Sequence, residues 1–217
     1  MRPRPVPGGE ALHRRRLIGP PHLDLRPPSH YLRPMRTSDA DIVFVPGLGG
    51  SGPDHWQTRW EAKLSTARRV WQADWERPDS VAWPARIAEA VAAVARPVIL
   101  VAHSIGVIAL VKAAPGMPTG IVRGAFLVAP ADVDAPGIEP DILKSFAPIP
   151  RDPLPFPSLL VASRNDPYCT YERAEDLAYA WGSAIVDAGE AGHLNPQSGF
   201  GPWPEGLMRF AGFLKQL

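Results

Sequence analysis

The sequence predicts one α/β domain, a three-layer α/β/α sandwich with a mostly parallel six-stranded sheet and no large lid. Three observations support this prediction. The chain has 217 residues, a length that suits a single domain with one core. Short apolar runs rich in β-branched residues alternate with helical patterns, which favours parallel strands joined by right-handed crossovers. The run 98-VILVA-102 leads directly into a helical pattern, as a central strand of such a sheet does.

The predicted strands and helices follow one another from Asp41 onward. A short continuous apolar run is typical of a strand buried on both faces, and six such runs occur. Helices are expected where apolar residues recur three or four positions apart, and Asp54 is a candidate N-cap for the first of them. The expected strands are 42–46, 69–75, 98–102, 121–129, 158–162 and 184–188. The expected helices are 54–64, 84–95, 105–113, 170–181 and 204–216.

The first 36 residues differ in composition from the rest of the chain. They hold eight arginines against two acidic residues, a balance of +6, so the remaining residues sum to −5. Eight prolines and little apolar periodicity predict a disordered extension over residues 1–36 and a folded domain over 37–217. One interpretation is a basic tail for an acidic partner. Because Met35 lies just before the first strand, we favour the other interpretation, a start codon assigned too far upstream.

Charge and cysteine content exclude several classes of protein. A formal net charge of +1 gives no reason to expect a nucleic acid or a membrane surface as partner. The single cysteine, Cys169, excludes an internal disulfide and fits a reducing compartment, so a cytoplasmic location is expected. No run approaches the roughly 20 apolar residues that span a bilayer, and the N-terminal arginines are not followed by the apolar region of a secretory signal.

A serine between a strand and a helix gives the strongest chemical signal. Ser104 lies in 102-AHSIG-106, at the carboxyl end of the predicted central strand, where function collects in such sheets. The small residues Ala102 and Gly106 permit the close approach of strand and helix that a nucleophile elbow needs. Backbone N–H groups at the helix N-terminus can stabilise developing negative charge. Ser104 is therefore the predicted nucleophile.

A serine hydroxyl needs a base, and the predicted domain has three histidines. His193, in 189-GEAGHL-194 after the last strand, is the predicted base, because it satisfies the chain order serine, acid, histidine. His103 adjoins the serine and is expected to point into the fold with a structural role. His55 is expected to make a local hydrogen bond, with a contact to substrate as the alternative.

The orienting acid is expected after a strand that lies between the serine and the histidine in sequence. Asp166, in 163-SRNDPY-168, meets this condition and is the predicted acid, since its carboxylate there could fix the imidazole tautomer. Asp132, after the preceding strand, is the competitor. The structural alternative for Asp166 is a helix-capping role or an Asx turn before Pro167.

The glycine-rich loop 46-PGLGGSG-52 has two interpretations. In the first, the Leu48 N–H and the N–H of Ile105, the residue after the nucleophile, form an oxyanion hole. In the second, the spacing Gly-x-Gly-x-x-Gly is a dinucleotide fingerprint with Asp74 as the ribose-binding acid. An NAD-binding oxidoreductase leaves the serine, acid and histidine unexplained and is the weaker alternative. A non-catalytic binding module on the same fold is a further one.

Several segments are typical of one enzyme family: the glycine-rich loop followed by 55-HWQTRW-60, then 74-DW-75 with Trp83, 101-VAHSIG-106, 129-APAD-132, 163-SRNDPY-168, 181-WG-182 and 192-GHLNPQSGFGPWPEG-206. The last is the most specific. From about Asp41 to its C-terminus the chain resembles the retinoblastoma-binding-protein-type serine hydrolases, which are compact α/β hydrolases common in bacteria. The resemblance implies a triad of Ser104, Asp166 and His193 and activity on small esters. Ile105 and Val107 differ from the common Leu and Cys, which should not affect the chemistry.

These residues predict a carboxylesterase-like serine hydrolase that cleaves small ester, thioester or amide substrates through an acyl-enzyme. The expected partner is a small-molecule acyl substrate. No cofactor and no metal are expected, since no histidine pair lies at i, i+4 on one helix and no second cysteine is present. The segment 131–157 holds seven prolines and is short for a lid, so we expect an ordered rim around an open, shallow site that favours short acyl chains.

Overall fold

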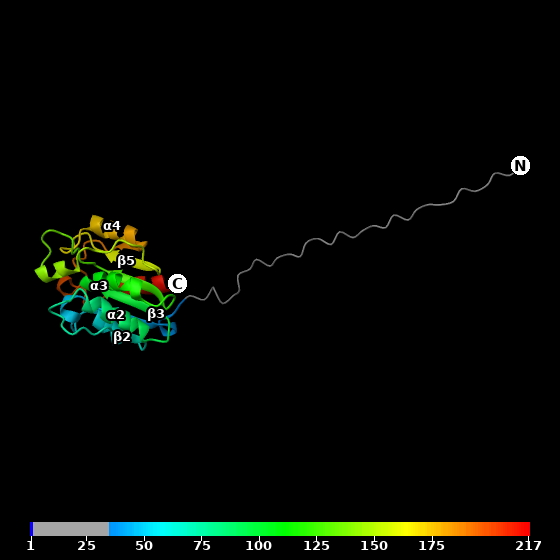
Figure 1. The fold of residues 1–217 in the computed structure, drawn as a ribbon, viewed down its shortest axis with the longest axis horizontal. Helices are drawn as coiled ribbons and strands as arrows, with labels where there is room; N and C mark the ends of the chain where they lie inside the picture. The colour runs from blue at the N-terminus through cyan, green and yellow to red at the C-terminus, as the bar shows by residue number, and fades with distance from the viewer. Residues whose placement is uncertain (2–34) are drawn as a thin grey trace. The chain divides into compact units, whose positions relative to one another are not determined.

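Six strands form one sheet in the order β2-β1-β3-β4-β5-β6, and every neighbouring pair is parallel (Figure 1). The computed structural model describes Met1 and residues 35–217, so the predicted extension over residues 1–36 falls almost wholly outside the described residues. The strands are β1 (Asp41–Val45), β2 (Ala67–Arg69), β3 (Val98–His103), β4 (Val122–Val128), β5 (Ser158–Ala162) and β6 (Ala184–Asp187). The predicted α/β class with six parallel strands is confirmed. β1 has β2 on one side and β3 on the other, so the direction in which successive strands are added to the sheet reverses at β1. In open α/β sheets, ligands bind at the carboxyl ends of the strands beside such a reversal.

Helices cover both faces of the sheet. Those of the described residues are α1 (Trp56–Glu61), α2 (Ala82–Ala92), α3 (Ile105–Ala113), α4 (Tyr171–Trp181) and α5 (Pro204–Leu214). The buried apolar residues form two core clusters. The first core cluster packs α2, α3 and α4 against one face of the sheet, and the second core cluster packs α1 and α5 against the other face. In Figure 1, α2 and α3 lie together over the sheet, and α4 lies beside β5. Within Met1 and residues 35–217, no helix is long and apolar enough to cross a membrane.

The apolar run of β1 is unbroken because helices cover the strand on both faces of the sheet. Val43 and Val45 face the first cluster, whereas Ile42 and Phe44 face the second, and all four are buried. A strand covered by helices on both faces needs apolar residues at successive positions rather than at alternate ones. α3 is likewise buried along most of its length, because it lies over the centre of the sheet.

The second predicted strand is wrong in its position, because β2 shares only Arg69 with the predicted range 69–75. β2 is an edge strand that pairs with β1 alone. The apolar residues that suggested a longer strand belong to the following loop. Trp75 covers the glycine-rich loop so closely that a Cβ on Gly50 would lie 2.7 Å from its ring, and Trp71 is 67% exposed. Loop packing, not the pleat of a strand, explains this run.

Candidate active site

Ser104 joins β3 to α3 in a strained backbone conformation. Its φ is 58° and its ψ is −132°, a region that costs a non-glycine residue about 1–3 kcal/mol. The turn is also crowded, since a Cβ on Gly106 would lie 2.4 Å from the Pro46 carbonyl oxygen at the end of β1. The small residue two positions after the serine is thus required by the approach of β1. The surrounding structure holds the Ser104 side chain at a sharp turn between strand and helix, as a nucleophile elbow requires.

Three predicted site residues from distant parts of the chain form one line of hydrogen bonds. Ser104 Oγ lies 2.8 Å from His193 Nε2, and His193 Nδ1 lies 3.0 Å and 2.9 Å from the two carboxylate oxygens of Asp166. An ionised carboxylate only accepts, so Nδ1 must carry the hydrogen. The lone pair of Nε2 in the neutral ring is then directed at the Ser104 hydroxyl. This is the tautomer that a general base for the serine needs.

The loop that carries His193 is held by side chains that the sequence reasoning did not single out. Ser198 Oγ accepts the His193 N–H at 3.1 Å, and Asn165 Oδ1 accepts the Gly192 N–H at 2.7 Å. The Tyr168 ring lies 4.5 Å from the His193 ring. All three side chains lie in segments that carry the family resemblance, which is the signal that could have found them.

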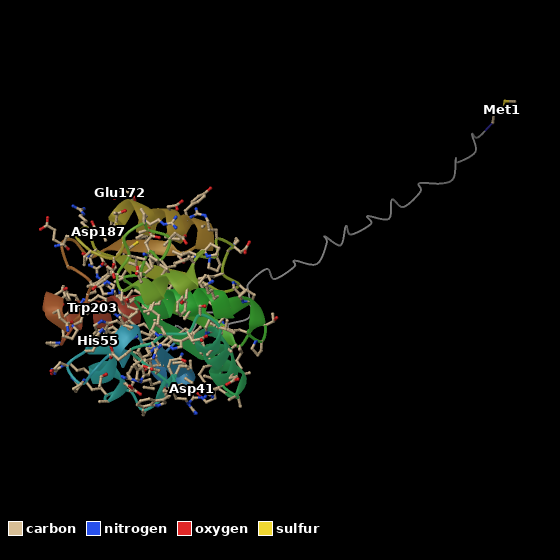
Figure 2. The ribbon with its side chains drawn as sticks, turned by 60° about the vertical axis from the view of Figure 1, so that its left-hand side comes forward. Met1, Asp41, His55, Glu172, Asp187 and Trp203 are labelled. Carbon is tan, nitrogen blue, oxygen red and sulfur yellow. The ribbon has the colours of Figure 1, made fainter. Side chains whose placement is uncertain are left out.

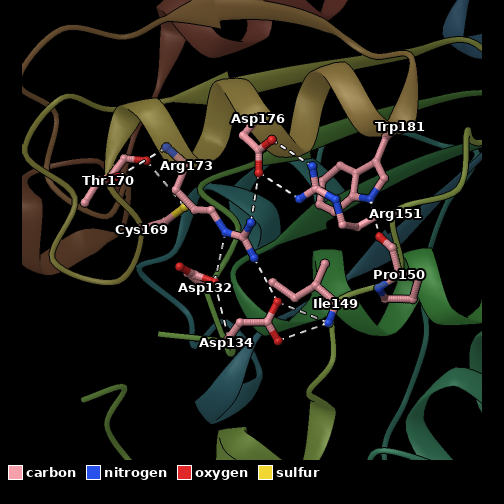
Figure 3. A network of polar contacts seen from close by, with 10 residues as sticks. All are labelled: Asp132, Asp134, Ile149, Pro150, Arg151, Cys169, Thr170, Arg173, Asp176 and Trp181. Carbon is pink, nitrogen blue, oxygen red and sulfur yellow. Dashed lines mark hydrogen bonds and ion pairs between the residues drawn. The ribbon is translucent and has the colours of Figure 1, made fainter. Parts of the chain in front are cut away.

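The competing acid, Asp132, belongs to a separate ion-pair network (Figure 3). Its Oδ1 accepts from Arg173 Nε at 3.2 Å, and the same guanidinium pairs with Asp134 and Asp176. Asp166 instead contacts the histidine, and its Oδ1 also accepts the Tyr168 N–H at 2.9 Å. Asp166 therefore forms the Asx turn that was the structural alternative for this residue, and it contacts His193 as well.

The loop after β1 packs directly against the serine. A Cβ on Gly47 would lie 2.8 Å from Ser104 Cβ, so the residue that follows Gly47, Leu48, begins close to Ser104. In this loop the Gly49 N–H donates to the Trp75 carbonyl. Within residues 35–217, no protein acceptor is found for the N–H of Leu48 or of Ile105. Leu48 and Ile105 therefore stay the predicted oxyanion donors.

The dinucleotide interpretation of the same loop gains no support from this geometry. A phosphate-binding helix would begin directly after the glycines, but α1 begins only at Trp56 and has six residues. Asp74 accepts the N–H groups of Glu76 and Arg77 through Oδ1, so its carboxylate closes a turn. Gly47 instead permits the close approach to Ser104, and Gly50 permits the close approach of the Trp75 ring.

His103 and His55 are both buried beside the site. His103 Nε2 lies 2.9 Å from the His193 carbonyl oxygen, so its predicted structural role is confirmed. His55 makes the predicted local hydrogen bond, because its Nδ1 accepts the Gln57 N–H at 3.2 Å. His55 is therefore the N-cap of α1, and the prediction of Asp54 for that position is wrong. Burial, followed by the charges of Arg69 and His193, lowers the pKa of His55 from 6.5 to about 3.

These buried imidazoles predict that the free energy of unfolding falls as the pH is lowered from about 7 to about 5. Burial also lowers the pKa of His103 well below 6.5. The unfolded chain therefore binds protons on both rings before the folded chain does, and stability rises with pH in this window. Each ring contributes a slope of up to about 1.4 kcal/mol per pH unit. Urea unfolding across the window measures the slope, and a flat profile would contradict the expectation.

Gln57 is a buried positioning residue that the sequence reasoning missed. Its Nε2 donates to the carbonyls of Val45 and Val101, at 3.3 Å and 3.0 Å, and its Oε1 accepts from Ser51 Oγ at 2.6 Å. One amide thus ties the ends of β1 and β3 to the glycine-rich loop. These are the two strands that the glycine-rich loop and Ser104 follow.

A cavity of about 700 Å³ opens in front of Ser104. One wall of the cavity is the segment 139–143, so the proline-rich segment 131–157 contributes to the rim of the site. This segment also contains a 3₁₀ helix, Asp141–Phe146, which was not predicted from the sequence. The remaining lining comes from the glycine-rich loop and residues 53–55 after it, from His103, and from the loops around Asp166 and His193. Besides Ser104 and His193, the lining residues are Leu48, Gly49, Ser51, Gly52, Pro53, Asp54, His55, His103, Glu139, Pro140, Leu143, Pro167, Tyr168, Asn195, Pro196, Gln197 and Ser198.

The parallel sheet, its strand order and the serine turn after the central strand place this chain in the α/β-hydrolase fold class. Residues 42–212 match the protein family described as serine hydrolase. The chain belongs to this serine hydrolase family, and the resemblance noted from its sequence is confirmed.

One solved structure agrees with this family assignment, and two others agree with the fold alone. The chain is 38% identical to a YdeN-like hydrolase from Pectobacterium atrosepticum, over 82% of this chain and 92% of that one, with a TM-score of 0.72. It is similar in fold to the ydeN gene product of B. subtilis, at 16% identity, coverage of 80% and 98%, and a TM-score of 0.62. It is also similar to the esterase domain of a Rhodothermus marinus protein, at 15% identity, coverage of 82% and 87%, and a TM-score of 0.59. The chain matches none of the curated proteins with which it was compared.

Proposed function

We propose that the chain hydrolyses carboxylic esters of small acyl groups through an acyl-enzyme formed on Ser104. The observation that carries this proposal is the line of hydrogen bonds from Ser104 through His193 to Asp166, built on a strained strand-to-helix turn. Membership of the serine hydrolase family supports it. The similarity in fold to an esterase domain agrees with ester substrates.

The proposed reaction follows from the geometry of these residues. His193 Nε2 accepts the proton of Ser104 Oγ as the oxygen attacks the ester carbonyl carbon, and Asp166 stabilises the imidazolium that results. The N–H groups of Leu48 and Ile105 donate to the oxyanion. The tetrahedral intermediate collapses, and His193 protonates the departing alcohol. Water, deprotonated by His193, then attacks the acyl-enzyme and releases the acid with Ser104 restored.

The lining of the cavity favours short acyl chains. Leu48 and Leu143 are the aliphatic side chains, proline aside, among the described residues that line it. Each methylene gains about 0.8 kcal/mol only where it is buried against apolar surface. A palmitoyl chain would find few aliphatic side chains along the cavity besides four prolines, whereas an acetyl or butyryl group needs few.

We therefore expect the protein to hydrolyse p-nitrophenyl acetate and butyrate with a higher kcat/KM than the palmitate, and Ser104→Ala to lose this activity. A preference for palmitate would contradict the short-chain assignment. A folded wild type that hydrolyses none of the esters would contradict ester hydrolysis itself and would favour a non-catalytic binding module.

A further inference from the structure

The Tyr168 ring lies against the predicted base and is open to the cavity. Among the residues that the structure describes, the rings of His103 and Tyr168 contact the His193 ring, and their centres lie 4.9 Å and 4.5 Å from its centre. Both residues line the cavity, but His103 is only 4% exposed, whereas Tyr168 is 36% exposed. Of these two rings beside the base, Tyr168 is therefore the one that a ligand can cover.

The backbone of Tyr168 is fixed by a hydrogen bond on each side of its Cα. Its N–H donates to Asp166 Oδ1 at 2.9 Å, and its carbonyl accepts the Asp132 N–H at 2.9 Å. No hydrogen bond of the Tyr168 hydroxyl to another residue is found within residues 35–217. The side chain thus presents its ring at a position that the backbone determines, and a ligand that packs on it pays little for ordering the site.

The lining that surrounds Tyr168 carries no charge apart from the base itself. Besides His193, the loops around Asp166 and His193 contribute Pro167, Tyr168, Asn195, Pro196, Gln197 and Ser198 to the lining. The acidic lining residues, Asp54 and Glu139, come from other segments. A charged group would lose hydration here without meeting an opposite charge, whereas an apolar group gains from contact with the ring and the two prolines.

The contact with His193 assigns this surface to the alcohol part of an ester. In the proposed reaction His193 protonates the departing alcohol, so the alcohol oxygen must lie within hydrogen-bond distance of His193 Nε2. The carbon atoms bonded to that oxygen are then beside the His193 ring and within reach of the Tyr168 ring that packs on it. The predicted oxyanion donors, Leu48 and Ile105, lie in the loop after β1 and at the start of α3, so the carbonyl oxygen is directed to different segments.

We propose that the Tyr168 ring packs against the alcohol part of the ester, and that the enzyme thereby selects esters of uncharged alcohols that carry an aromatic ring. This inference rests on the proposed ester hydrolysis. It makes Tyr168 a specificity-determining residue. Two aromatic rings in contact attract each other more than their buried area alone explains, so an aromatic alcohol gains more here than an aliphatic alcohol of similar size.

A matched pair of esters tests the inference. Benzyl butyrate and cyclohexylmethyl butyrate share the acyl group and a six-membered ring on a methylene group, and only the benzyl ring is aromatic. Chromatography of the released butyrate gives kcat/KM for each ester. The ratio of the two values is divided by the ratio of their hydroxide-catalysed rate constants, which removes the difference in intrinsic reactivity. For the wild type we expect a normalised ratio of about five in favour of the benzyl ester, which corresponds to about 1 kcal/mol.

Tyr168→Leu is the informative variant, because it keeps an apolar side chain and both backbone hydrogen bonds but removes the aromatic ring. We expect its normalised ratio to fall to about one, and Tyr168→Met, a second aliphatic replacement, to behave in the same way. Tyr168→Phe keeps the ring and should keep the wild-type ratio. Tyr179→Leu is the matched control, since Tyr179 is 89% exposed on α4 and does not line the cavity. Thermal unfolding checks that each variant is folded.

A second ratio distinguishes contact with the alcohol from a merely structural role. A ring that only holds His193 in place would change kcat/KM by the same factor for every ester, and the benzyl-to-cyclohexylmethyl ratio would stay at its wild-type value. p-Nitrophenyl acetate and butyrate share their alcohol and differ in the acyl group. We expect Tyr168→Leu to keep the wild-type ratio of kcat/KM between these two esters. A changed acetate-to-butyrate ratio together with an unchanged benzyl-to-cyclohexylmethyl ratio would place the ring at the acyl group and overturn the inference.

The outcomes separate this inference from the proposed function. A wild type with a normalised benzyl-to-cyclohexylmethyl ratio near one overturns the inference and leaves ester hydrolysis standing. The same holds if folded Tyr168→Leu or Tyr168→Met keeps the wild-type ratio, or if the wild type hydrolyses p-nitrophenyl butyrate but neither ester of the pair. A folded wild type that hydrolyses none of these esters refutes the proposed function and this inference with it.

Discussion

Replacing Asp166 with Asn is expected to lower kcat by about 10⁴-fold and to leave the fold intact. The carboxylate holds the hydrogen of His193 on Nδ1, whereas an Asn amide can donate to Nδ1 and so favour the tautomer with the hydrogen on Nε2. That tautomer cannot accept the Ser104 proton. The amide oxygen of Asn can still accept the Tyr168 N–H, so the local turn is kept. Steady-state hydrolysis of p-nitrophenyl butyrate gives kcat, and circular dichroism checks the fold.

Asp132→Asn is the matched control for this prediction, because Asp132 also follows a strand at the same edge of the sheet. Its carboxylate pairs with Arg173, which keeps its ion pairs with Asp134 and Asp176 in the variant. We expect Asp132→Asn to retain the wild-type kcat. A large loss of kcat in Asp132→Asn together with retained activity in Asp166→Asn would assign the acid to Asp132.

Replacing Trp56 with Ala is expected to lower the free energy of unfolding by about 3–5 kcal/mol. Trp56 is fully buried in the second core cluster and contacts the Trp60 and Trp203 rings at 4.8 Å and 5.2 Å. His55 and Trp203, both labelled in Figure 2, each contact this ring. The Trp56 Nε1–H also donates to the carbonyl of Leu194 at 2.9 Å, and Leu194 directly follows His193, the predicted base. Urea unfolding measures the loss.

Trp56→Phe separates packing from the hydrogen bond. A phenyl ring keeps part of the aromatic contact but leaves the buried Leu194 carbonyl without its donor, which costs about 1–3 kcal/mol. We expect Trp56→Phe to lie between the wild type and Trp56→Ala in stability. A stability of Trp56→Ala within about 1 kcal/mol of the wild type would show that this cluster does not hold α1 to the sheet.

The central part of the fold was predictable because its signals are local. Strands buried on both faces produce unbroken apolar runs, and the runs at β1, β3, β4, β5 and β6 gave positions close to those observed. The serine turn was predictable for a related reason, since the small residue at Gly106 follows from the crowding at the end of β1. The chain order of serine, acid and histidine then indicated which side chains the fold would bring together.

Other features depend on contacts that leave little trace in the local sequence. β2 pairs with a neighbouring strand on one side only, and the aromatic residues after it cover a loop. The prediction therefore placed the strand too far along the chain, where these residues lie. Gln57 and Ser198 act through hydrogen bonds to backbone atoms. A single polar residue gives no local pattern, so only the family resemblance of the segments that contain them could have pointed to them. The exclusion of Asp132 likewise required the position of Arg173, 41 residues further along the chain.

The assignment of Ser104 as an activated nucleophile is tested most directly by intact-mass measurement after treatment with a fluorophosphonate. A serine whose hydroxyl is hydrogen-bonded to a correctly oriented histidine reacts with such a probe, whereas an ordinary serine does not. We predict a single adduct on the wild type and none on Ser104→Ala. A folded wild type that stays unmodified, or an adduct that persists in Ser104→Ala, would contradict this assignment.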